Sequence, residues 1–519
     1  MASIGTQSPA ARLLSVVVIA LSCWWTTSIQ AASDRAPAVD RDTVVVAINK
    51  AIENLDVHMA GSGDASRTAF QLYDALYTFD LTGRLIPNLA TAHRVSPDGL
   101  TWRFTLRPGV RFHNGDRLTS ADVKFSMERI LNPETRSSRR PALAPVMDKV
   151  ETPDAQTVVF HLKQPDGAFL NKMAGYLYVV PEKYTKGLAK LEDFSRAPVG
   201  SGPWKFVENR VGETVTLERF DGYWGPKPKA KRLILRVIDE PSTRLNALIT
   251  GEVDLADGIP PTDVEKLRQN TAFDVMVNPV SSPLHIRLYS NRPELPVSKL
   301  EVRQALNYAI DQNAIIKNVL YGLGEPLATY FSKHYPVGGD PTLKPYPYDP
   351  DKARALLKAA GYPNGFSTKL YSPVGWPKEL AEVIAGYWSQ IGVQAEIQRL
   401  DYAAWTRLNN THKSDPMTLT PFSNAIFDLS STLQGAVLKT GNWSDYYNPK
   451  VEELAAKVLP ISDPVQRGRL FKEIGKILHD DAAAIYITEE VTVFAKKKGL
   501  KWGALRGSVN LNFRDIGWN

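Results

Sequence analysis

Segments with the apolar period of a strand alternate with segments with the period of a helix along most of this chain. Trp102, Phe104 and Leu106 alternate with polar neighbours as in a half-buried strand, and the turn at Pro108–Gly109 predicts a hairpin. Thr119 is a predicted helix N-cap, and the apolar residues after it fall on one helical face: Val123, Met127, Ile130 and Leu131. The alternation predicts α/β lobes.

Two further helix starts have capping residues. Ser298 and Glu301 are predicted to form a capping box. Asp349 before Pro350 is a predicted N-cap followed by a proline in the first helical turn. Both features concern stability and carry no functional information.

Length and composition set the scale of the protein. A chain of 519 residues holds material for two to four domains, and 43% hydrophobic residues exclude a disordered chain. No internal repeat or low-complexity linker separates the lobes, so we expect them to be closely packed. The net charge of +7 is too thinly spread over this length to predict nucleic-acid binding.

The N-terminus has the pattern of a secretory signal peptide over residues 1–32. Arg12 precedes the apolar run 13–21, and small residues lead to Ala31 and Ala32, where cleavage fits best. The run is shorter than the ~20 apolar residues that a membrane-spanning helix needs. We therefore expect an exported, periplasmic protein.

Cys23, the one cysteine of the sequence, lies inside this segment. Cleavage after it leaves a mature chain without a disulfide. The alternative is a lipoprotein in which Cys23 becomes the acylated N-terminus, although Ala20-Leu21-Ser22-Cys23 fits that signal loosely.

The sequence contains no recognisable catalytic or metal-binding motif. No two of the eight histidines have i, i+2 or i, i+4 spacing, and no Gly-x-Ser-x-Gly elbow occurs. The adjacent carboxylates Glu489 and Glu490 are predicted to lie on a solvated edge rather than to act as an acid–base couple. No metal, cofactor or catalytic residue is predicted, and we expect a protein that is not an enzyme.

Several segments resemble a known family. Residues 97–123 (PDGLTWRFTLRPGVRFHNGDRLTSADV) match its signature, and weaker matches follow in the family's order at 200–204, 223–225, 303–311 and 352–362. The chain thereby resembles the extracellular solute-binding proteins of family 5, which serve peptide-, nickel- and opine-type ABC importers and include dipeptide- and oligopeptide-binding proteins. The resemblance extends from about residue 43 to the C-terminus.

The resemblance implies an α/β fold, a two-lobed periplasmic-binding-protein clamshell of type II in its large class. Lobe I is expected at 40–283 with an extra subdomain at about 84–199, and lobe II at 284–488. Residues 489–519 are expected to return to lobe I.

The implied function is that of a monomeric periplasmic receptor that binds a solute between the lobes and delivers it to the permease subunits of an ABC importer. A short peptide or peptide-like solute is the expected ligand. The open alternatives are an opine, an oligosaccharide or a chelated metal, and an exported hydrolase of peptides or cell-wall fragments. Presentation of the ligand to a chemoreceptor is a further option.

The position that anchors peptides in the family departs from its pattern here. Peptide binders carry a tryptophan followed three residues later by an aspartate that pairs with the peptide's α-amino group. In this sequence Phe422 replaces the tryptophan and Ala425 the acid. A buried ammonium without a counter-charge is costly, so the departure weakens the expectation of a peptide unless Asp428 substitutes. Without such an acid, free and N-acetylated peptides should bind about equally.

Other ligand contacts are implied by the same alignment. Trp405 aligns with a pocket tryptophan, and Met59 lies in a cleft-facing loop. Ser423 and Asn424 offer neutral hydrogen bonds. Asp428 is either a ligand contact or a helix cap, Tyr486 precedes the return to lobe I, and Arg140 is a candidate cation with surface exposure as its default.

Overall fold

The computed structural model describes residues 41–60, 62–374, 378–424, 426–508 and 510–519. Residues 41–519 form one compact unit. The predicted signal peptide, Cys23 and Ala425 lie outside the described residues.

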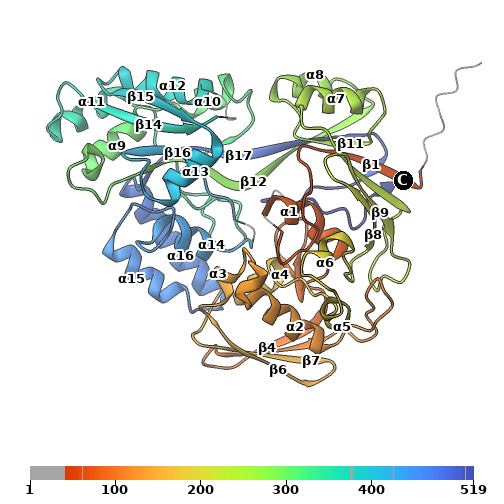
Figure 1. Cartoon of the computed structure of the whole chain (residues 1–519). Helices are drawn as coiled ribbons and strands as arrows, with labels where there is room; N and C mark the ends of the chain where they lie inside the picture. Colours follow the sequence, from red (N-terminus) through yellow and green to blue (C-terminus); the bar gives the residue numbers. More distant parts are fainter. Residues whose placement is uncertain (1–40, 61, 375–377, 425, 509) are drawn as a thin grey trace, which may run out of the picture. The chain divides into compact units, whose positions relative to one another are not determined.

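One mixed sheet of eleven strands runs through the unit (Figure 1). The short β13 (Glu325–Pro326) pairs with β17 at its side. The remaining strands follow the order β15 (Gln394–Leu400), β14 (Ser367–Pro373), β16 (Met417–Pro421), β12 (Phe273–Leu288), β17 (Ala484–Lys497), β11 (Leu255–Asp257), β1 (Thr43–Ile48), β10 (Arg232–Val237), β9 (Thr214–Arg219) and β8 (Trp204–Arg210).

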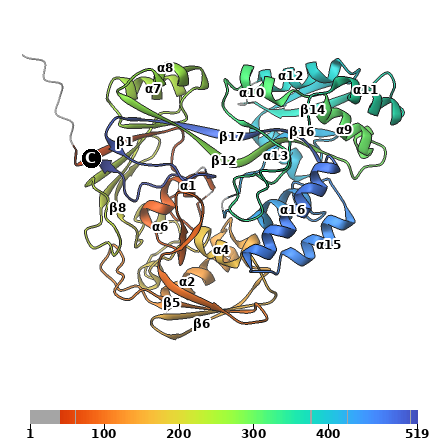
Figure 2. The same ribbon diagram turned by 180° about the vertical axis from the view of Figure 1, so that it is seen from behind.

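The two longest strands, β12 and β17, join the two halves of this sheet. They run antiparallel side by side in both Figures 1 and 2, with β11 beside β17 in one half and β16 beside β12 in the other. Their pairing is interrupted between Pro279 and Pro283, two residues that have no N–H to donate to the ladder. Ser281, between them, has a φ of 45°. The lobe boundaries expected at 283/284 and 488/489 stay a prediction.

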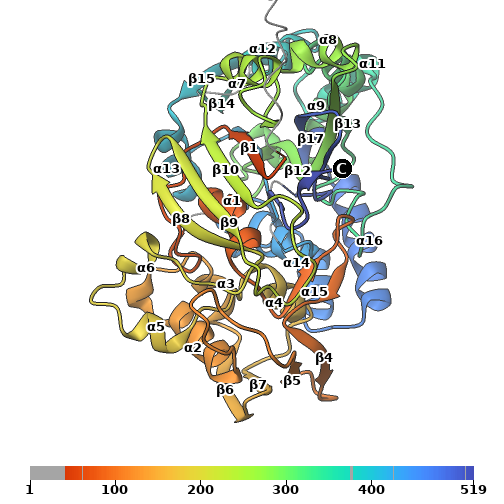
Figure 3. The ribbon, with the colours of Figure 1, turned by 90° about the vertical axis from the view of Figure 1, so that its right-hand side faces the viewer.

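A separate four-stranded antiparallel sheet belongs to the region expected as an extra subdomain (Figure 3). Its order is β4 (Ala90–Val95), β5 (Thr101–Leu106), β7 (Thr157–Leu162) and β6 (Met147–Asp154). The hairpin predicted after Leu106 is wrong, because β5 pairs with β4 and β7 rather than with residues 110–112. The burial of Trp102, Phe104 and Leu106 on one face is confirmed.

Helices cover the sheets. The first residues of three of these helices can be compared with the N-caps predicted from the sequence. Thr119 and Asp122 form the capping box of α2, and Asp349 caps α11. The cap at Ser298 is wrong, because the N-cap of α9 is Lys299. The helices are α1 (Ser62–Leu72), α2 (Ser120–Leu131), α3 (Arg140–Leu143), α4 (Phe169–Gly175), α5 (Glu182–Lys186), α6 (Asp193–Arg196), α7 (Pro241–Ile249), α8 (Val264–Arg268), α9 (Leu300–Tyr308), α10 (Gln312–Asn318), α11 (Pro350–Ala359), α12 (Lys378–Ser389), α13 (Tyr402–Asn410), α14 (Leu429–Thr432), α15 (Pro449–Val458) and α16 (Pro464–Asp480).

The segment after β16 is held by contacts with the N-terminal part of the described chain. Phe427 is buried in a hydrophobic core that includes residues of β4, β5 and β7, and its ring centroid lies 4.7 Å from that of Phe79. Asn171 Nδ2 donates to the Ile426 carbonyl at 2.9 Å. These contacts fix the segment that carries most of the predicted ligand residues.

Candidate functional site

The predicted ligand residues 422–424 directly follow β16, next to the two long strands. β16 pairs with β12 from Leu284 to Leu288, so its C-terminal end lies beside the interruption of the β12–β17 ladder. Ser423 is exposed, and its Oγ lies 3.3 Å from Ser282 Oγ on β12. The structure thereby connects Ser423 to the crossing strands.

An aromatic cluster lies behind this segment. Trp405 is only 1% exposed, and its Nε1 donates to Thr418 Oγ1 at 3.0 Å. The half-buried Trp443 meets it edge-to-face at 5.6 Å between ring centroids, and meets Phe422 in the same manner at 6.5 Å. Trp405 therefore supports a partly exposed aromatic pair, Phe422 and Trp443. Sequence reasoning missed Trp443, which has no signal beyond its residue type.

Asn424 and Asp428 are committed to bonds within their own segment. Asn424 Nδ2 donates to the Asp428 carbonyl at 2.7 Å, and its Oδ1 accepts from the Ile426 N–H. The Asp428 carboxylate caps α14 by accepting from Ser430 N–H and forms a buried ion pair with Arg467 at 2.5 Å. A carboxylate held in this way already has its counter-charge.

Three other candidates lie apart from this cluster. Met59 lines a cavity of about 610 Å³ together with Glu53, Asn54 and Arg196, and no described residue of 421–428 lines it. Tyr486 is 1% exposed and its hydroxyl donates to the Leu478 carbonyl at 2.9 Å, as a core tyrosine does.

Arg140 is half-buried at the start of α3. Its Nε donates to the Leu131 carbonyl at 2.8 Å. This bond ties α3 to the end of α2.

Glu489 and Glu490 are not the solvated edge that the sequence predicts. Glu489 is 2% exposed, because β17 passes between β12 and β13 at this point. Burial raises the pKa of Glu489 to about 8, and the charges of Glu325 and Glu490 add to the effect. Glu489 also lines a second cavity of about 450 Å³ with Thr329 and Lys333.

Glu490 faces a different environment from its neighbour. It is half-buried, and its Oε2 accepts a hydrogen bond of 2.6 Å from Ser282 Oγ. Burial raises the pKa of Glu490 above its ordinary value. Glu490, Ser282 and Ser423 thus form a chain of oxygen atoms that crosses β17, β12 and the end of β16.

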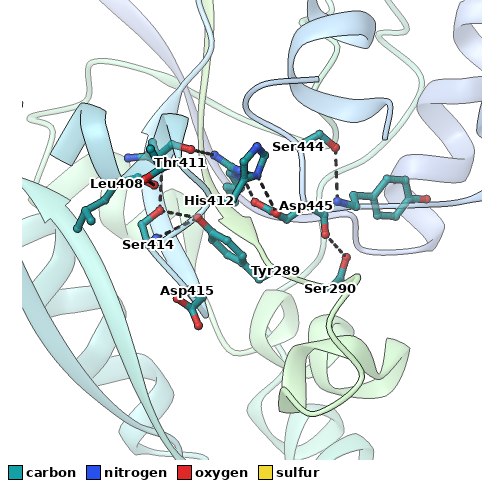
Figure 4. Close-up of polar contacts among 12 residues, drawn as sticks. Tyr289, Ser290, Leu408, Thr411, His412, Ser414, Asp415, Ser444 and Asp445 are labelled. Carbon is teal, nitrogen blue, oxygen red and sulfur yellow. Dashed lines mark hydrogen bonds and ion pairs between the residues drawn. The ribbon is translucent and has the colours of Figure 1, made fainter. Parts of the chain in front are cut away.

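A buried ionic network holds the loops near the aromatic cluster. Arg287 on β12 forms an ion pair with Asp445. His412 Nδ1 lies 3.0 Å from Asp445 Oδ1 (Figure 4). In the same view Tyr289 and Ser414 are joined by a bond of 2.7 Å between their hydroxyls. The network fixes the loops that precede β16 and follow Trp443.

Comparison with known proteins decides the family. The model for bacterial extracellular solute-binding proteins, family 5 Middle, matches residues 84–444. The chain belongs to this family. The family and the type II two-lobed α/β fold expected from the sequence are confirmed.

Individual relatives cover almost the whole chain. The glutathione-binding protein GsiB of Pectobacterium atrosepticum is 30% identical over 97% of this chain and 99% of its own length. The periplasmic binding protein DppA of Helicobacter pylori, solved in complex with the peptide STSA, is 27% identical, with a TM-score of 0.78 over 92% of this chain and 98% of its own. AgaA of A. tumefaciens R10, solved with agropinic acid, is 27% identical, with a TM-score of 0.75 over 92% and 99% of the two chains.

Within the described ranges no group of three or more His, Cys, Asp or Glu side chains is placed to hold a metal ion. No helix in the part of the chain described here is long and apolar enough to cross a membrane. The relatives above are binding proteins rather than enzymes.

Proposed function

We propose that this protein is the solute receptor of an ABC importer and captures a short peptide or peptide-like solute beside the crossing strands. The observation that carries the proposal is the grouping of Ser423, Phe422 and Trp443 at the end of β16, next to Ser282 and Glu490. Aromatic faces with a few polar groups are typical of small-molecule sites. The names of the relatives, which include glutathione and peptide binders, support the same solute class.

Glutathione is the first solute to test. It is a tripeptide with one ammonium, two carboxylates and two amide bonds, and the relative GsiB is named for binding it. Agropinic acid is the rival, because the relative solved with it is as similar in identity as the peptide-bound one.

Isothermal titration with glutathione, trialanine and agropinic acid tests this proposal. We expect stoichiometric binding of glutathione or trialanine and recovery of the added solute intact. Binding of agropinic acid alone would contradict the peptide-like class. Conversion of the solute would favour the exported hydrolase over a receptor.

Replacing Trp443 by alanine should weaken binding of the peptide-like solute at least about ten-fold, equivalent to ~1.4 kcal/mol, because it removes one of the two partly exposed rings of the aromatic pair. Titration calorimetry of Trp443→Ala measures the loss. Tyr447→Ala is the control, since Tyr447 is a 54% exposed aromatic outside the cluster. Equal affinities in all three proteins would remove the aromatic pair from the site.

We propose a cellular role that the family supports. In this role the protein is exported by its N-terminal segment, acts in the periplasm as a monomer without catalysis, and hands its solute to the permease subunits. Uptake of labelled solute by cells that lack the gene, with and without its restoration, tests this role.

A further inference from the structure

Glu490 lies at the point where the ladder between β12 and β17 is interrupted. The flanking pairs are Pro279 with Val491 and Pro283 with Glu489, so Glu490 falls in the gap between them. Successive side chains of a strand point to opposite faces. Glu489 accordingly lies on the side of Glu325 and the 450 Å³ cavity, while Glu490 meets Ser282.

The hydrogen bonds around Glu490 have a defined direction. Ser282 has one hydroxyl hydrogen and donates it to Glu490 Oε2 at 2.6 Å. The Ser282 oxygen is then left to accept, so the bond of 3.3 Å to Ser423 is donated by Ser423. The hydrogen bonds therefore run from the exposed Ser423 through Ser282 to the Glu490 carboxylate.

Glu490 has no counter-charge among the described residues, because no lysine, arginine or histidine there forms an ion pair with it. Burial raises the pKa of Glu490 above its ordinary value. The Asp428 carboxylate, in contrast, has Arg467 as its cation. A half-buried carboxylate without a cation favours a ligand that brings a positive charge.

We propose that Glu490, together with Ser282 and Ser423, is the anchor for a protonated amine of the solute. The inference rests on the proposed function and adds to it the class of solute, one that carries an ammonium group. Glu490 would supply from β17 the counter-charge that sequence comparison expects three residues after Phe422. It reverses the expectation that free and N-acetylated peptides bind alike.

The test compares each peptide with its N-acetylated form in wild type and Glu490→Gln. The probes are glutathione, trialanine and their N-acetylated derivatives, measured by titration calorimetry. Wild type should prefer the free amine by about ten-fold or more. Glu490→Gln keeps the shape and the acceptor for Ser282 but removes the charge, so the preference should fall to about three-fold or less while the N-acetylated form still binds.

Glu489→Gln is the matched control. It makes the same change one residue away on the opposite face of β17, and the preference for the free amine should persist. If both variants lose the preference for the free amine, the cause is a general disturbance of β17. That result would overturn the proposal that Glu490 anchors the amine.

The outcomes separate the anchor from the proposed function. Peptide binding by wild type without preference for the free amine overturns the anchor and leaves the proposed function standing. Binding of spermidine but of no peptide, abolished in Glu490→Gln, supports the anchor and overturns the peptide-like class. Binding of none of these amines overturns both.

Discussion

Replacing Glu489 by glutamine should stabilise the protein at pH 8.5 by roughly 3 kcal/mol, and the gain should shrink as the pH falls and become a small loss near pH 4.5. Burial raises the pKa of Glu489 from 4.5 to about 8, so the folded state holds a proton that the unfolded state releases across this interval. The free energy of unfolding therefore falls by about 1.4 kcal/mol per pH unit between these values.

The full interval corresponds to roughly 5 kcal/mol, and glutamine avoids this cost because it has no proton to lose. Part of the gain is offset at every pH, because the amide brings N–H groups to a place where Glu489 Oε1 has no hydrogen-bond partner among the described residues. Urea unfolding of wild type and Glu489→Gln at several pH values measures the difference in their free energy of unfolding. Other titrating groups contribute equally to both proteins and cancel in this difference.

Glu294→Gln is the control, because Glu294 is exposed and the same change there should alter stability by less than about 0.5 kcal/mol. A difference between wild type and Glu489→Gln that stays constant from pH 4.5 to 8.5 would contradict the raised pKa.

Replacing Asp428 by alanine should destabilise the protein by about 3–5 kcal/mol. The change leaves Arg467, which is 2% exposed at its side chain, without its counter-charge, and it removes the N-cap of α14. Chemical unfolding measures the loss. Solute affinity, measured where both proteins are folded, should change by less than about three-fold.

Two variants control this experiment. Asp428→Asn keeps a capping oxygen and removes only the charge, so its loss should be smaller than that of alanine. Glu453→Ala breaks exposed ion pairs with Lys450 and Lys457 and should destabilise the protein far less than Asp428→Ala. A stable Asp428→Ala protein with a hundred-fold weaker solute affinity would make Asp428 a ligand contact instead of a structural residue.

Local patterns were enough to predict the elements but not their partners. The alternation of Trp102, Phe104 and Leu106 specifies a strand with one buried face, and the structure has it. Pairing with β7, more than fifty residues away, depends on tertiary packing that a nearby turn does not reveal. The cap at Thr119 was predictable because both partners lie within one turn.

The candidate site was predictable only in part, because it also depends on contacts between segments that are distant in the sequence. Residues 422–424 came from alignment with the family, and the structure connects Ser423 with Ser282. Nothing local in the sequence identifies Ser282 or Trp443, since their roles depend on strands and loops brought together from distant positions. The sequence predicts that Glu489 and Glu490 are exposed, because adjacent charged residues usually are. In the structure β17 is paired along both of its edges at this point.

Native mass spectrometry of the protein purified from its exported fraction tests the central claim most directly. We expect one solute per chain, released intact on denaturation, with the amide bonds of a short peptide and a free amine. A stoichiometric solute without amide bonds, or a released molecule that differs from the one supplied, would contradict a receptor for peptide-like solutes.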